Sequence, residues 1–462
     1  MRIIYFLIAL LAGTFLKAQD PGKKLSSAMK ALEGDEQFKH AILSLYVVDG
    51  KTGRTIYEKN AQAGLAPASC QKVITSTAAF ELLGKNYTYK TPVRLYRSAD
   101  SARIFITGSG DPTLGSWRWN YTTTGYIIKE IQKALQQSGI LFLGCDITVD
   151  ENKFPGQPVP DGWIWQDIGN YYGAGAWAFN CRENQYDLIL RSGKFPGDTT
   201  GIAGFNPSSA RIPITNYITA GKKGSGDNAY IYAAPYSNTA YAAGTIPPAQ
   251  EKFVISGSLT YPAEFFIREL KTGLNAAGIA ISDGSNISFL LQGRQTGAYE
   301  TIHTITSPTL DSINYWFLKK SINLYGEVLV KTIAAEKTKS GSADTGIAII
   351  KDFWSKRGIE RSALNIIDGS GLSPANRVTT NALVAIMQYA KNQEWFSSFY
   401  NALPEMNGIK MKDGYINGVR SFTGYVKSRT GNEYTFSFIV NNFYGSAGTV
   451  REKMWKVLDI LK

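Results

Sequence analysis

The segment 66–84, APASCQKVITSTAAFELLG, places a hydroxyl, a thiol and an amine within four residues, at Ser69, Cys70 and Lys72. A serine hydroxyl is a poor nucleophile unless a neighbouring group takes its proton, and a lysine can do so when burial or nearby charge lowers its pKa. Pro67 and Ser69 are typical of a helix start, and residues i and i+3 of a helix share a face. Ser69 is therefore a candidate nucleophile with Lys72 as its base; the alternative is a capping serine and a solvated lysine.

Other nucleophiles and bases are scarce. Cys70 would point about 100° away from Ser69 on a helix, so we expect it to be a small buried packing residue. The two histidines, His40 and His303, have no metal-ligand neighbour at helical spacing. A zinc hydrolase needs several such ligands, and Ser-His-Asp or Cys-His catalysis needs a placed histidine. We therefore expect no metal, no cofactor, and a base other than imidazole.

Two later segments carry polar residues at short spacing. KKSINLYGE places Ser321 and Asn323 at i and i+2, at or just before a helix, and MKDGYINGV places Lys412 and Gly414 at the start of a strand. The order S-x-x-K, S-x-N, K-x-G is the pattern of penicillin-binding proteins and serine β-lactamases.

Two other segments match the third motif by letters. KTG at 51–53 precedes Ser69 and lies in the turn of a hairpin, and RTG at 429–431 is the turn of the last hairpin. The segment 412–414 alone has both the right order and a following strand, so we assign the third motif there.

With these motifs the chain resembles the D-alanyl-D-alanine carboxypeptidase/endopeptidase family, the class C low-molecular-mass penicillin-binding proteins. The resemblance extends over nearly all of the chain and includes PASCQK, GSGDPTL, DGSGLSPANRVTT and GYINGVRSFTGYV. A long insertion between the first two motifs separates this family from compact β-lactamases. The resemblance implies a secreted serine peptidase that acts on D-Ala-D-Ala termini or D-alanyl cross-links in peptidoglycan stem peptides, with β-lactams as covalent inhibitors.

The resemblance also implies a role for each motif residue. Ser69 attacks the carbonyl of the penultimate D-alanine, and Lys72 is the general base. Ser321 relays the proton toward the leaving amine, while Asn323 orients Lys72 and the substrate amide. Lys412 supplies positive charge near the substrate carboxylate.

The third motif departs from the family pattern. Asp413 stands where the family usually has Thr, and Tyr415 where Ser or Thr is common; those hydroxyls help bind the terminal carboxylate. An aspartate there repels a carboxylate unless it pairs with a basic group such as Arg420. We expect Asp413, Gly414 and Tyr415 to bind substrate, with the oxyanion held by the backbone N–H groups of Ser69 and Tyr415.

Further binding residues follow from the resemblance. The family often has Arg at the position of Pro374, and Arg377 is the expected substitute. Asp150 and Phe154 match a region of the inserted part that can face the cross-link amino acid in relatives; the alternative is a pair of ordinary surface-loop residues. The aromatic residues of segment 161–179 either stack on sugars or pack the loop against its own domain.

The N-terminus is typical of an exported protein. Arg2 precedes an apolar run at 3–15, and the small Ala18 marks a cleavage point. The run of about 13 residues is too short to span a bilayer comfortably, so we expect a cleaved signal peptide at 1–18 rather than a retained anchor. A periplasmic or secreted protein with no stable membrane span follows.

The chain of 462 residues has a net charge of +12. This charge suits an anionic partner such as cell wall, or it is scattered and keeps the protein soluble. No nucleic-acid motif is present, so no nucleic-acid partner is expected. In an oxidising compartment Cys145 and Cys181 are the pair we expect to form a disulfide.

The pattern of elements predicts an α+β fold. Hairpins at both ends of the chain and helices beside them indicate an antiparallel sheet flanked by helices, a serine β-lactamase/DD-peptidase-like domain formed by 19–92 and 297–462. We expect an inserted domain II at 93–181 and 251–296, with a domain III at 182–250 nested inside it.

Two functional alternatives remain open at this point. The altered third motif is compatible with a catalytically weakened protein that binds wall without turnover. The same scaffold also serves β-lactamases and esterases, although the long insertion and the lack of an obvious deacylating carboxylate disfavour them.

Overall fold

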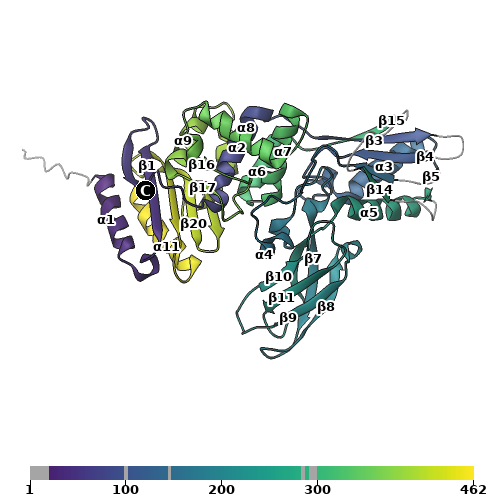
Figure 1. Cartoon of the computed structure of the whole chain (residues 1–462), viewed down its shortest axis with the longest axis horizontal. Helices are drawn as coiled ribbons and strands as arrows, with labels where there is room; N and C mark the ends of the chain where they lie inside the picture. The colour runs from purple at the N-terminus through teal and green to yellow at the C-terminus, as the bar shows by residue number, and fades with distance from the viewer. Residues whose placement is uncertain (1–19, 98–101, 144–146, 282–286, 291–298) are drawn as a thin grey trace, which may run out of the picture.

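The computed structural model describes residues 20–97, 102–143, 147–281, 287–290 and 299–462 (Figure 1). The expected signal peptide at 1–18 lies outside these residues. Within the described ranges, no helix combines the length and apolar character needed to cross a membrane.

A six-stranded antiparallel sheet forms one end of the molecule, with the order β18-β19-β20-β21-β1-β2. Both predicted hairpins are present, and they join each other because β1 pairs with β21 along its whole length, from Ile42 opposite Asn441 to Asp49 opposite Tyr434. The strands are β1 (Ile42–Asp49), β2 (Thr55–Lys59), β18 (Glu405–Met406), β19 (Ile409–Ile416), β20 (Val419–Lys427) and β21 (Glu433–Asn441).

Helices cover both faces of this sheet (Figure 1). On one face, α1 (Pro21–Glu33) and α11 (Ala447–Leu458) bury one apolar stripe each against the strands, as the helical spacing of the last segment predicts. The other face packs against a helical layer. This layer contains α2 (Lys72–Leu83), α6 (Leu310–Lys319), α7 (Asn323–Thr338), α8 (Ala343–Ser355), α9 (Thr380–Lys391) and α10 (Phe396–Ala402). The expected α+β class is confirmed.

The middle of the chain forms a second region with a five-stranded sheet of order β14-β6-β4-β3-β15. The helices α3 (Thr124–Gln137) and α5 (Pro262–Ala276) pack together, and the short strands that follow them, β5 (Phe142–Leu143) and β13 (Ala280–Ile281), pair in parallel. Because β15 (Glu300–Thr306) pairs with β3, this sheet extends beyond the expected boundary at residue 296. The other strands are β3 (Lys90–Arg97), β4 (Ala102–Thr107), β6 (Ile147–Asp150) and β14 (Ile287–Leu290).

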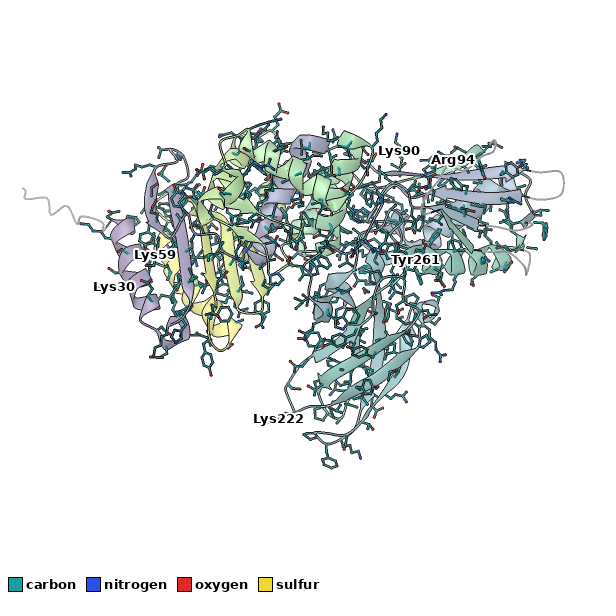
Figure 2. All side chains as sticks on the ribbon, in the orientation of Figure 1. Lys30, Lys59, Lys90, Arg94, Lys222 and Tyr261 are labelled. Carbon is teal, nitrogen blue, oxygen red and sulfur yellow. The ribbon has the colours of Figure 1, made fainter. Side chains whose placement is uncertain are left out.

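Two three-stranded sheets follow α4 (Trp165–Ile168) in the chain and extend away from the rest of the molecule (Figure 1). Figure 2 shows Lys222 at their far end and Tyr261 where they join the five-stranded sheet region. One sheet contains β7 (Gln185–Ser192), β8 (Thr200–Asn206) and β12 (Phe253–Ser258); the other contains β9 (Ile214–Ala220), β10 (Asn228–Tyr232) and β11 (Ala240–Ile246).

Glu183 forms a buried ion pair within the inserted region and a hydrogen bond to the helical layer. Arg182, Glu183 and Asn184 have φ angles of 56°, 51° and 52°, a left-handed turn that non-glycine residues seldom adopt. The turn directs Glu183 inward, where its Oε1 accepts from Arg118 Nε at 2.6 Å and from the Tyr325 hydroxyl of α7 at 2.9 Å. The contacts made by Glu183 offset the strain of the turn.

We predict that Glu183→Gln lowers the free energy of unfolding by on the order of 3 kcal/mol, because Arg118 then keeps a largely buried charge without its partner. Urea denaturation measures the change. The control is Glu130→Gln, which breaks an exposed pair with Lys133 in α3 and should cost under about 0.5 kcal/mol. Equal losses in the two variants would contradict the importance of the Glu183 pair.

Candidate active site

Ser69 lies on a short 3₁₀ turn, Ala68–Gln71, that leads directly into α2. The first nine residues of α2 are buried, so the helix runs through the interior of the helical layer. Ala68 has a φ of 45°, an uncommon value for a residue with a side chain. Ser69 follows directly and is half-buried, and its turn contacts strands β19 and β20 of the large sheet.

Lys72 lies beneath Ser69 and is fully buried. Its Nζ is 2.9 Å from Ser69 Oγ, 2.6 Å from Asn323 Oδ1 and 2.7 Å from the carbonyl oxygen of Ser370. An ammonium group has three protons to donate, and these three acceptors match them. The predicted pairing of the first and second motifs around Lys72 is therefore present in the structure.

The environment of Lys72 lowers the pKa of its ammonium group, which therefore gives up a proton more readily than that of an ordinary lysine. Burial, followed by the nearby positive charge of Lys412, lowers the pKa of Lys72 to about 7. The carboxylates of Asp368 and Glu327 act in the opposite direction. A lysine with a pKa near 7 is partly neutral at physiological pH, so it can accept a proton from Ser69.

Asn323 begins α7 and bridges two parts of the chain. Its Oδ1 accepts from Lys72, while its Nδ2 donates to the carbonyl oxygen of Tyr172 at 2.8 Å. Ser321 lies two residues earlier with a φ of 57°, in the turn between α6 and α7. Hydrogen bonds at both Oδ1 and Nδ2 thus fix the side chain of Asn323. Ser321 lies on the strained turn beside it.

The loop 368–371 supplies contacts that the sequence reasoning missed. Asp368 is fully buried and its carboxylate accepts five hydrogen bonds. The donors are the side chains of Gln71, Trp163 and Asn376 and the backbone N–H groups of Gly371 and Ser373. The only sequence signal was the segment DGSGLSPANR, which the family resemblance included without assigning a role.

Glu327 of α7 holds the same loop from the other side. Its two carboxylate oxygens accept from the backbone N–H groups of Gly369 and Ser370, each at 2.9 Å. Burial and the neighbouring Asp368 raise the pKa of Glu327. Because Ser370 presents its carbonyl oxygen to Lys72, Glu327 and Asp368 together fix one of the three acceptors of the lysine.

Two glycines allow the backbone segments to meet at Ser69. A Cβ at Gly371, which has a φ of 82°, would collide with the carbonyl oxygen of Ala68. A Cβ at Gly414 would lie 2.8 Å from the backbone nitrogen of Ser69. Strand β19 therefore passes directly beside the Ser69 backbone, and only glycine permits that approach.

Lys412 lies in the middle of β19, not at its start as expected, and its side chain is fully buried. Its Nζ donates to the backbone carbonyl of Asp413 at 2.7 Å and to the carboxylate of Asp413 at 3.0 Å. Arg420 lies 3.7 Å from the other carboxylate oxygen, the pairing that the sequence suggested. Burial would raise the pKa of Asp413, but Lys412 and Arg420 outweigh that effect and lower it.

Cys70 points away from the site, as predicted. Its thiol is fully buried and donates to the carbonyl oxygen of Lys412 at 3.2 Å. Burial raises the pKa of Cys70 to about 11. A thiol with such a pKa holds almost no thiolate at neutral pH, so Cys70 is a packing residue.

The other residues expected to bind substrate lie away from this cluster or make local contacts. Asp150 accepts from Asn152, both at the backbone and at the side chain. Phe154 is buried against Ala178 and Ala335, with Lys331 Nζ 5.7 Å from its ring centre, so it is not a surface-loop residue. The structure does not bring these two to Lys72, and their role in binding stays a prediction.

Arg377 is exposed and donates to the carbonyl oxygens of Pro374 and Asn376 in its own loop. Its expected role as a substitute for the family arginine also stays a prediction. Cys181 is a free, buried thiol. The expected partner, Cys145, lies outside the described residues, so the Cys145–Cys181 disulfide stays a prediction; the Cys181 side chain is packed into the core of the inserted region.

The aromatic residues of segment 161–179 fall into a buried group and an exposed group. Trp163 and Trp177 are buried, as expected for packing, and Trp163 Nε1 donates to Asp368. Trp165 and Tyr171 are instead exposed by 47% and 52%.

Comparison with solved structures identifies the same architecture elsewhere. Penicillin binding protein 4 (dacB) of Haemophilus influenzae superposes with a TM-score of 0.79 at 18% identity, over 95% of this chain and 99% of that one. Its complex with a β-lactam matches with a TM-score of 0.74 over the same shares. At this identity the likeness shows the fold.

Comparison of sequences gives the family. A D-alanyl-D-alanine carboxypeptidase of Actinomadura sp. is 24% identical over 456 residues, covering 92% of this chain and 82% of the relative. D-alanyl-D-alanine carboxypeptidase DacB of Haemophilus influenzae is 22% identical over 427 residues, covering 86% and 84%. The model of the D-Ala-D-Ala carboxypeptidase 3 (S13) family matches residues 25–460, so the chain belongs to this family of serine peptidases.

Proposed function

We propose that the protein is a serine DD-peptidase that hydrolyses D-Ala-D-Ala termini or D-alanyl cross-links of peptidoglycan through an acyl-enzyme on Ser69. One observation carries the proposal. A buried lysine with a pKa near 7 has its Nζ 2.9 Å from Ser69 Oγ, which is the arrangement that activates a serine without histidine.

In the acylation step, neutral Lys72 takes the proton of Ser69 as Oγ forms a bond to the carbonyl carbon of the penultimate D-alanine. The backbone N–H groups of Ser69 and Tyr415 stabilise the oxyanion. The C–N bond then breaks, and Ser321 relays a proton from Lys72 to the leaving amine. Water hydrolyses the ester and restores the Ser69 hydroxyl.

The same serine accounts for penicillin binding, since a β-lactam amide acylates it and retains the leaving group in the ring-opened adduct. The apolar run at 3–15 and the small Ala18 support export, so we place the enzyme in the periplasm or outside the cell. Its partners there are the stem peptides of peptidoglycan.

We predict that fluorescent penicillin labels the wild type and Cys70→Ala but not Ser69→Ala, because Ser69 is hydrogen-bonded to Lys72 whereas the Cys70 thiol donates to a backbone carbonyl. Gel fluorescence and intact mass measure the adduct. Labelling that persists in Ser69→Ala would contradict the assignment of the nucleophile. Labelling that appears and decays within minutes in the wild type would favour the β-lactamase alternative.

We also predict a pH-dependent acylation rate. The pKa of Lys72 is about 7 and only the neutral amine takes the Ser69 proton, so the rate should rise through pH 7 and level off about one unit above it. Stopped-flow acylation by a chromogenic cephalosporin between pH 5.5 and 9 measures the profile. Lys72→Arg should not acylate at any pH, because a guanidinium stays protonated. A flat wild-type profile would exclude Lys72 as the base.

A third prediction concerns Asp413. Its carboxylate is paired with the Lys412 ammonium and repels the carboxylate of a substrate. Asp413→Thr should therefore lower KM about three- to tenfold for a peptide ending in free D-Ala-D-Ala. The same peptide with a C-terminal amide should show no change. Asp344→Asn, which removes one negative charge from an exposed position on α8, is the matched control.

The Asp413 experiment also distinguishes the second candidate, a wall-binding protein with weakened catalysis. The engagement of Lys412 by Asp413 favours that candidate. If wild type labels with penicillin but turns over peptide only after Asp413→Thr, the natural protein is the weakened form.

A further inference from the structure

The sheet β10-β11-β9 has an unusual solvent-facing side. Its inward side chains, such as Ile218, Ile231 and Ile246, are buried in the core of the inserted region. The outward positions of these strands carry tyrosines and small or uncharged residues, and none of them carries a charge. They are Thr215, Tyr217, Thr219, Asn228, Tyr230, Tyr232, Tyr241, Ala243 and Thr245.

Four of the aromatic side chains at this face form an array, which we call the aromatic platform: Trp165, Tyr217, Tyr232 and Tyr241. The rings of Tyr232 and Tyr241 stack with centroids 4.6 Å apart and planes 10° apart. Trp165 lies 6.0 Å from Tyr232, and its Nε1 donates to the Tyr241 hydroxyl at 3.3 Å. The platform is therefore held in place before any ligand arrives.

The rings remain accessible although they contact one another. Tyr217 is 65% exposed and its ring lies 6.5 Å from that of Tyr241, while Trp165 is 47% exposed. Aromatic side chains bury large areas when they can, so a preformed exposed array indicates a binding surface.

One member of the platform, Trp165, lies in a segment of the chain that contacts the candidate active site at both ends. Trp163 donates to Asp368 beside Lys72, and the carbonyl oxygen of Tyr172 accepts from Asn323. Trp165 and α4 lie between these two anchors, and Figure 1 shows α4 between the helical layer and β10. The Trp165 end of the platform therefore lies next to the segment that contacts Asp368 and Asn323.

We propose that the aromatic platform binds the glycan strand of peptidoglycan, a neutral-backbone polymer of N-acetylated sugar rings. The flat C–H faces of pyranose rings pack on aromatic rings, and the hydroxyls of the tyrosines and threonines can bond sugar hydroxyls and acetamido groups. The lack of charge on the face fits a sugar better than an anionic lipid or nucleic acid. This inference rests on the proposed function, since the stem peptides that reach Ser69 are attached to glycan strands.

The test uses a soluble oligomer of N-acetylglucosamine as a neutral probe of the sugar rings, because glycan strands freed of stem peptides by an amidase carry a free lactyl carboxylate on each N-acetylmuramic acid. Binding to the full mature chain is followed by tryptophan fluorescence and by calorimetry. We expect Tyr217→Ala and Trp165→Ala each to weaken binding at least about tenfold, while Tyr217→Phe, which retains the ring, should bind nearly as the wild type does. The matched control is Tyr444→Ala, because Tyr444 is 82% exposed and lies outside the inserted region.

The outcomes separate this inference from the proposed function, because penicillin labelling reports the Ser69 site independently. Wild type that labels with penicillin but does not bind glycan would overturn the platform proposal alone. Wild type that binds glycan without labelling would leave the platform proposal standing and overturn catalysis. Equal weakening in Tyr444→Ala, or a concentration-dependent dimer that Tyr217→Ala abolishes, would also overturn the proposal, since the face would then bind a second copy of the chain.

Discussion

The removal of the Lys72 ammonium from water is the constraint on which the rest of the site depends. A buried amine must have its protons accepted, or its charged form becomes too costly. Here the acceptors come from three separate segments: the nucleophile, the start of α7 and the loop 368–371. The buried carboxylates of Asp368 and Glu327 keep the pKa of the lysine from falling further. Correct folding of all three segments thus sets the reactivity of Ser69.

The inserted region forms part of this site. The carbonyl of Tyr172 holds the amide of Asn323, and Trp163 donates to Asp368. Glu183 reaches Tyr325 of α7, two residues after Asn323. The inserted region therefore holds the second motif in place, and it also carries the aromatic platform. The same contacts thus link the proposed glycan-binding surface to the catalytic residues.

Much of this arrangement could be predicted from the sequence. The hairpins, the helical stripe of α11 and the closeness of Ser69 to Lys72 follow from residue types at short spacing, whereas the meeting of Lys72 with Asn323 follows from the family resemblance. The contribution of Ser370 could not, because it acts through a carbonyl oxygen that any residue has. The burial of Phe154 also could not, since it depends on the distant Ala335.

The pairing of β1 with β21 gives the large sheet a seam between the two ends of the chain. During synthesis, the second strand of that seam emerges only after nearly the whole polypeptide has been released. The strand that passes beside the Ser69 backbone, β19, is also among the last segments to appear. Ser69 therefore acquires its surroundings late, after the inserted region has emerged, and an incomplete chain lacks the strand that passes beside it.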